Sequence, residues 1–171
     1  GVLLVGGFPG GRDAARMDDR LNALLDSGIR SVINLLTEEE EVARENDGTH
    51  YQAYEDRLEQ LGEERDLVLE IARYAIDDGN TLSEPEMQLV LDSLDAEIDG
   101  RDSPTLIHCT DGRGRAGVAV GCYLARHDIA VGKAALARIR ELRAAHEELA
   151  GKKSPKTMVE EKFVLRWKKD Q

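Results

Sequence analysis

Apolar residues occur along the chain in two arrangements, short unbroken runs and longer stretches with helical spacing. The short runs predict buried strands over residues 2–5, 29–36 and 105–108. Residues 67–76 are a further candidate strand, and their mixed polarity also allows a helix as the alternative. Strands that alternate with helices indicate an α/β fold, with a central, mostly parallel sheet and helices on both sides. We expect residues 1–171 to form a single layered domain of this kind.

Capping residues indicate where several helices begin. Thr37 with Glu40 and Ser83 with Glu86 match the capping box, which predicts a short acidic helix after Thr37 and a longer one that runs to Gly100. The Ser154–Pro155 pair is expected to open a last helix that ends near residue 167. The remaining helices are expected over residues 17–25, 51–61, 115–126 and 131–149.

Composition narrows the classes of function. With 34 acidic and 23 basic residues, the formal net charge of −11 repels nucleic acid and anionic lipid, so neither is an expected partner. No apolar stretch approaches the roughly 20 residues that span a bilayer, so membrane insertion and a signal peptide are not expected. Cys109 and Cys122 are too few for a disulfide framework and suit the reducing cytoplasm. No His, Cys and carboxylate cluster has metal-ligand spacing, so no metal or other cofactor is expected.

One loop concentrates the candidate chemistry. Residues 108–115 read His-Cys-Thr-Asp-Gly-Arg-Gly-Arg, the pattern H-C-x-x-G-x-x-R, between a predicted strand and a predicted helix. A loop that curls into a helix N-terminus points several backbone N–H groups at one spot, and the helix dipole favours a phosphate there. Gly112 and Gly114 permit the curl. The same field stabilises a thiolate at Cys109, and the planar fork of Arg115 can hold two phosphoryl oxygens.

This loop resembles the catalytic loop of the protein-tyrosine-phosphatase superfamily, where H-C-x-x-G-x-x-R is followed by Ser or Thr. Upstream, residues 75–79 read Ala-Ile-Asp-Asp-Gly and are similar to the general-acid loop Pro-Ile-x-Asp-Gly of small dual-specificity members. Residues 4–10, 118–127 and 154–167 are similar to segments of bacterial dual-specificity-like phosphatases. The resemblance therefore covers nearly the whole chain, and the family's layered α/β fold agrees with the predicted order of elements.

The resemblance implies a role for each matching residue. Cys109 would be the nucleophile that forms a phosphocysteine intermediate, Arg115 the phosphoryl clamp and Asp78 the general acid, with Asp77 as the alternative acid. His108 would order the loop. The substrate's phosphoryl group would bind at Thr110, Asp111, Gly112, Arg113, Gly114 and Arg115.

Two positions depart from the expected pattern. Asp111 places a negative charge in a loop that binds an anion, and Ala116 stands where the family has a hydroxyl beside the cysteine. The partner implied by the resemblance is a phosphorylated protein, with phosphotyrosine or dual specificity, or a small phosphomonoester. An inositol-phosphate or phosphoinositide phosphatase is the first alternative, although Asp111 argues against it. A weakly active phospho-binding module is the second.

Overall fold

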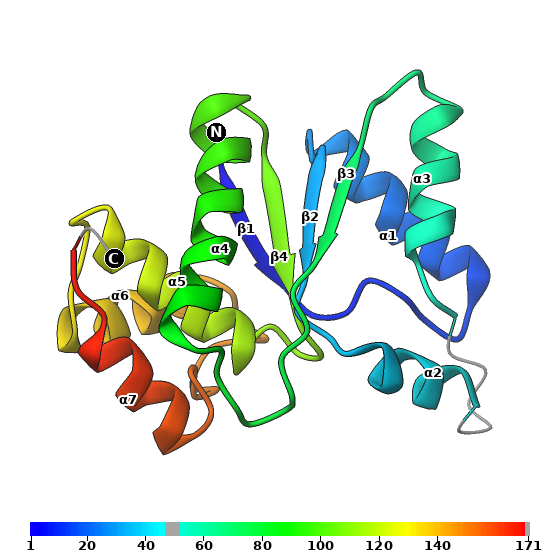
Figure 1. The fold of residues 1–171 in the computed structure, drawn as a ribbon. Helices are drawn as coiled ribbons and strands as arrows, with labels where there is room; N and C mark the ends of the chain where they lie inside the picture. Colours follow the sequence, from blue (N-terminus) through cyan, green and yellow to red (C-terminus); the bar gives the residue numbers. More distant parts are fainter. Residues whose placement is uncertain (47–51, 170–171) are drawn as a thin grey trace.

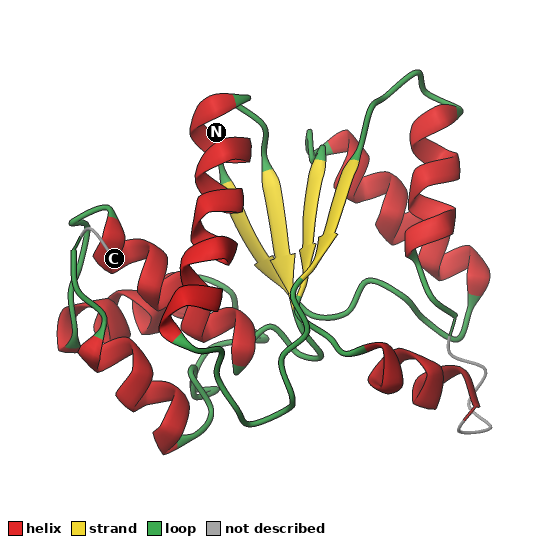
Figure 2. Cartoon of the chain, viewed as in Figure 1, coloured by secondary structure: helices red, strands yellow, loops and turns green. Residues whose placement is uncertain are grey.

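The computed structural model describes residues 1–46 and 52–169, and its strands form one parallel sheet (Figures 1 and 2). All neighbouring strands run parallel, which confirms the predicted α/β fold and shows that the ambiguous stretch 67–76 contains a strand. The order across the sheet is β1 (Leu3–Gly6), β4 (Thr105–His108), β2 (Ser31–Asn34) and β3 (Glu70–Arg73).

The register places the ends of the strands side by side. His108, the last residue of β4, pairs with Gly6 of β1 and with Asn34 of β2. All four residues of β4 are buried. Because β4 lies between β1 and β2, the loop that follows it begins inside the sheet and not at its edge. Ligands of open parallel sheets bind outside the carboxyl ends of the strands, and the chain there is the loop with the H-C-x-x-G-x-x-R pattern.

Helices cover both faces of the sheet (Figure 1). The side chains of Val32 and Leu106 pack in one apolar core, and those of Ile33 and Ile107 pack in the other, as the alternation along a strand requires. The first core is closed by α1 (Ala14–Asp26) and α3 (Glu55–Glu63). The second is closed by α4 (Glu84–Asp95) with its π-helical extension η1 (Ala96–Gly100), α5 (Arg115–Arg126), α6 (Lys133–Ala144) and α7 (Met158–Arg166). The short acidic helix α2 (Glu38–Asn46) lies beyond the carboxyl ends of the strands.

The start of the last helix differs from the prediction. Helix α7 begins at Met158, because Thr157 is its N-cap and forms a complete capping box with Glu160. Ser154, the expected cap, instead donates a hydrogen bond from Oγ to the carbonyl oxygen of Arg113, at 2.7 Å. The prediction of a helix opening at Ser154–Pro155 was therefore wrong, and this segment supports the loop after β4.

Two further helices are shorter than predicted. Helix α6 ends at Ala144, because the backbone beyond it forms turns in which the N–H of Leu149 donates to the carbonyl of His146. Helix α3 begins at Glu55, because the backbone N–H of Gln52 donates to Gly11 in an isolated bridge. Residue 51, where that helix was expected to start, lies outside the described residues. Within the described part of the chain, no helix combines the length and apolar character needed to cross a membrane.

Helix α5 packs against α7 at a glycine, Gly121, which gives a test of the packing. A Cβ at Gly121 would lie 2.6 Å from Cγ1 of Val164. We expect Gly121→Ala to lower the free energy of unfolding by about 1–3 kcal/mol in urea denaturation, because the core is overpacked there. Gly100→Ala is the control, since a Cβ at Gly100 would lie 4.0 Å from the carbonyl oxygen of Asp95, an ordinary contact distance. Equal stability of the two variants would contradict this packing.

Candidate active site

The loop after β4 is shaped by close contacts with β1. Gly112 has φ +66°, and a Cβ there would lie 2.6 Å from the carbonyl oxygen of Gly6. Both the left-handed backbone and the lack of space therefore require glycine at this position. Cys109, at the start of the loop, is 2% exposed, and the loop ends where α5 begins at Arg115.

Hydrogen bonds from outside the loop hold its carbonyl groups. The backbone N–H of Phe8 donates to Thr110 at 3.2 Å, and Nη1 of Arg143 donates to Gly112 at 2.9 Å. Ser154 holds the carbonyl of Arg113 in the same way. A trans peptide carries its N–H opposite its C=O, so the N–H groups of the following residues point away from these partners. This arrangement, at the N-terminus of α5, suits an anion.

Arg115 is buried and fixed by acceptors from three segments. Its Nη1 donates to the carbonyl of Ile76 at 2.6 Å and to Glu40. Its Nη2 donates to Oε1 of Glu40 and to Oγ1 of Thr110, both at 2.9 Å. Burial alone would lower the pKa of this guanidinium, but hydrogen bonds and charge from Glu40 hold it above its ordinary value. Nε is buried without a hydrogen-bond partner among the described residues, so one donor of this charged group is unmet.

Glu40 is a site residue that the sequence did not reveal. From the sequence it is expected only to cap α2, and its Oε2 does accept the backbone N–H of Thr37 at 3.1 Å. The same carboxylate also pairs with Arg115, 75 positions away along the chain. No local pattern signals this contact, since it arises only because β2 and β4 are neighbours in the sheet.

Asp78 lies beside the loop, as the alignment with the general-acid loop predicts. Its Oδ1 is 3.7 Å from Nη2 of Arg115 and 3.7 Å from Nζ of Lys156, and its side chain is 62% exposed. Asp77 is also exposed but forms no ion pair within the described ranges. The structure therefore brings Asp78 to the loop. Lys156, which also faces Asp111 at 3.7 Å, is a second neighbour that the sequence did not indicate.

The charge of Asp111 is paired within the loop. Its Oδ2 accepts hydrogen bonds from Nε and Nη2 of Arg113 at 2.9 and 2.7 Å, and its Oδ1 accepts the backbone N–H of Arg113 at 3.2 Å. Burial alone would raise the pKa of Asp111, but Arg113 and Lys156 hold it below its ordinary value. Asp111 is thus a carboxylate that closes the curl of the loop, and its charge is offset by two cations.

His108, the residue before Cys109, is buried and neutral. It is fully buried, and its Nε2 lies 2.7 Å from the hydroxyl of Tyr54. Burial lowers the pKa of His108 to about 3, so the imidazole is uncharged at neutral pH. Its backbone carbonyl accepts the N–H of Leu35 at 3.0 Å, which ties the end of β4 to the chain after β2.

Ala116 is fully buried in the first turn of α5 and offers no hydroxyl.

One group of possible metal ligands lies among the described residues, outside the loop. Oxygens of Asp95 and Asp99 and a ring nitrogen of His127 lie within 4.8 Å of one another. Asp95 is already engaged by His127 at 2.8 Å and by Nε of Arg126 at 3.1 Å. These neighbours make the group an ion-pair cluster between α4 and the end of α5.

A cysteine at the end of a central parallel strand, followed by a glycine-containing loop and an arginine in the first helical turn, is the arrangement of cysteine-dependent phosphatases. Residues 4–164 match the profile of the PTP-SAK family, described as "Swiss Army Knife protein, DSP-PTPase phosphatase domain". The chain belongs to this family. No curated protein sequence matches the chain significantly.

Solved phosphatase structures share the fold. Kinase-associated phosphatase, solved with its catalytic cysteine replaced by serine, is 18% identical with a TM-score of 0.66, over 86% of this chain and 73% of its own. TpbA of P. aeruginosa is 16% identical with a TM-score of 0.63, over 95% and 78%. PTPMT1 in complex with PI(5)P is 18% identical with a TM-score of 0.61, over 95% and 90%. At these identities the likeness shows the fold alone.

The pairing of Glu40 with Arg115 gives a test of the site. We expect Glu40→Gln to lower the free energy of unfolding by about 1–3 kcal/mol, because the buried guanidinium loses its charged acceptor. Urea denaturation at neutral pH measures the change. The exposed neighbour Glu39, changed to Gln, is the control and should stay within about 0.5 kcal/mol of wild type. A similar loss in both variants would show that the ion pair contributes nothing specific.

Proposed function

We propose that this protein hydrolyses phosphomonoesters in two steps, with Cys109 as the nucleophile. The observation that carries the proposal is the buried guanidinium of Arg115, which is fixed at the loop with its Nε unoccupied. A planar guanidinium at this position can hold the equatorial oxygens of a phosphoryl group through hydrogen bonds. Catalytic roles for Cys109 and Asp78 are proposed with it, because both lie at the same loop.

In the first step the thiolate of Cys109 attacks phosphorus and forms the S–P bond. The bond between phosphorus and the leaving oxygen breaks, and its electron pair goes to that oxygen. Asp78, in its protonated form, supplies the proton that makes the leaving group an alcohol or phenol. Arg115 and the backbone N–H groups of residues 110–115 bind the nonbridging oxygens.

In the second step water attacks the phosphocysteine and the S–P bond breaks. Its electron pair returns to sulfur, and Asp78, now a carboxylate, accepts the proton from water. The products are inorganic phosphate and the regenerated thiolate. Protein groups perform every transfer in this sequence, so it uses no metal and no organic cofactor.

We propose phosphorylated proteins, with phosphotyrosine or dual specificity, as the substrates. Inositol phosphates or phosphoinositides are the second candidate, because Arg113 and Lys156 offset the charge of Asp111, the residue that argued against them. A panel of phosphopeptides and inositol phosphates, assayed for phosphate release, separates the two. Wild-type protein that binds phosphopeptides but turns over neither class would instead be the phospho-binding module.

The domain and compartment follow from the same proposal. Residues 1–171 would act as one phosphatase domain, since both apolar cores pack against the one sheet. Cys109 and Cys122 are free thiols, and a nucleophilic thiol must stay reduced, so the cytoplasm is the proposed location.

Replacing the nucleophile tests the mechanism. We expect Cys109→Ser to lower kcat for an aryl phosphate by a factor on the order of 10³ or more. Vanadate should still bind, because Arg115 and the loop N–H groups remain. Cys122→Ala is the control and should keep near wild-type activity, since Cys122 is buried within α5, about two turns beyond Arg115. Activity above a tenth of wild type in Cys109→Ser would refute the nucleophile.

The two adjacent aspartates give a matched pair of variants. We expect Asp78→Asn to lower kcat for a substrate with a poor leaving group by about 10²–10⁴, the usual contribution of a general acid. Asp77→Asn should change it by less than about threefold, because among the described residues Asp78 and not Asp77 forms an ion pair with Arg115. An aryl phosphate with a good leaving group should be affected less by either change. Interchanged effects would assign the acid to Asp77.

A further inference from the structure

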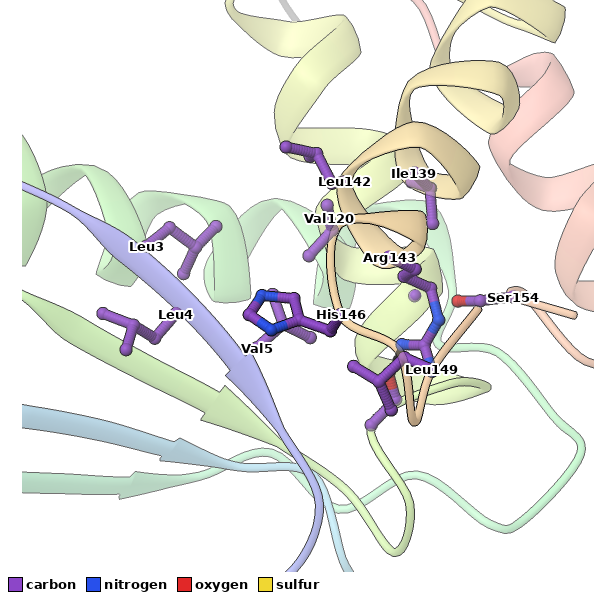
Figure 3. A pocket seen from close by; sticks show the side chains of 12 residues that line it. Leu3, Leu4, Val5, Val120, Ile139, Leu142, Arg143, His146, Leu149 and Ser154 are labelled. Atoms are coloured by element: carbon purple, nitrogen blue, oxygen red, sulfur yellow. Dashed lines mark hydrogen bonds between the residues drawn. The ribbon is translucent and has the colours of Figure 1, made fainter. Parts of the chain in front are cut away.

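A cavity of about 390 Å³ lies behind the catalytic loop, between the edge strand β1 and helices α5 and α6 (Figure 3). Its volume is within the range of small-molecule sites. Most of its wall is apolar and is formed by Leu3, Leu4, Val5, Val120, Ile139, Leu142 and Leu149.

One end of this cavity carries the guanidinium of Arg143. Figure 3 shows the side chain reaching from α6 toward Ser154 and Leu149. Nη1 is occupied by the carbonyl of Gly112, but Nε and Nη2 are buried without a hydrogen-bond partner among the described residues. Among the described residues, Arg143 also forms no ion pair. Unmet buried donors of a charged group are costly, so an acceptor at this place would be strongly favoured.

The electrostatics of Arg143 point the same way. Burial lowers the pKa of its guanidinium, and the positive charge of Arg113 acts in the same direction. Asp111 and Cys109 act in the opposite direction without abolishing this shift. An anion beside Nε and Nη2 would offset both the burial of the guanidinium and the repulsion from Arg113.

We propose that this cavity binds an amphiphilic carboxylate, such as a medium-chain fatty acid. Nε and Nη2 of Arg143 form the planar fork that a carboxylate accepts in bidentate fashion. The alkyl chain would lie along the leucine and valine side chains, which a purely polar anion leaves uncovered. His146 also lines the cavity.

The site would be physically linked to the catalytic loop. The same guanidinium that receives the carboxylate holds the carbonyl of Gly112, the residue whose backbone sets the curl of the loop. Binding is measured directly in the test below, so the outcome does not depend on whether the protein turns over phosphate esters.

Calorimetric titration of the wild-type protein with octanoate, below its micelle concentration, tests the site. We expect saturable binding, weaker by about tenfold for hexanoate because two buried methylenes are lost. Octan-1-ol should bind at least about tenfold more weakly, because it lacks the charge that Arg143 recognises. No saturable binding of octanoate, or equal affinity for octan-1-ol, would overturn the proposal.

Two variants with matched controls locate the site. Arg143→Met should weaken octanoate binding by at least about tenfold, whereas Arg140→Met, at an exposed position of the same helix, should leave it unchanged. Leu142→Glu brings a negative charge to the cavity wall at a position already 45% exposed, and should weaken binding similarly even if Arg143→Met does not fold. Leu165→Glu, 41% exposed on α7, is its control. Unchanged affinity in both cavity variants would refute the assigned site.

Discussion

The buried charge of Arg115 is the constraint on which the rest of the site depends. A guanidinium that is only 1% exposed must find acceptors inside the protein, and no single segment supplies enough of them. Glu40 follows β2, Ile76 follows β3 and Thr110 follows β4. These acceptors meet only because the three strands end side by side in a parallel sheet. The strand order is thus a condition of the site's electrostatics as well as of core packing.

The proposed binding of an anion at this loop has a second requirement, which the surrounding helices and loops meet. Carbonyl groups of the loop would repel a phosphate, but donors from Phe8, Arg143 and Ser154 hold three of them from outside. The carboxylate of Asp111 is offset by Arg113 within the loop. The loop can therefore present backbone donors at the N-terminus of α5, although the protein as a whole carries a net charge of −11.

Local patterns predicted the elements that local physics determines. The strand over residues 105–108 and the helix over 115–126 were predicted with the bounds that the structure has, because a buried apolar run and an unbroken apolar face define them. The Ser154–Pro155 cap was wrong, since Thr157 with Glu160 supplies a full capping box a few residues later. The contacts of Glu40, Lys156 and Arg143 with the loop could not be predicted, because they join segments that are distant in sequence and meet only through the fold.

The central claim is that the thiol of Cys109 carries a phosphoryl group during turnover. Rapid mixing of the protein with an aryl phosphate, followed by an acid quench and peptide mass spectrometry, tests it most directly. The account predicts a phosphoryl adduct on the peptide that contains Cys109, formed within one turnover and absent from the peptide that contains Cys122. Turnover without any such adduct on Cys109, or an adduct on another residue, would contradict it.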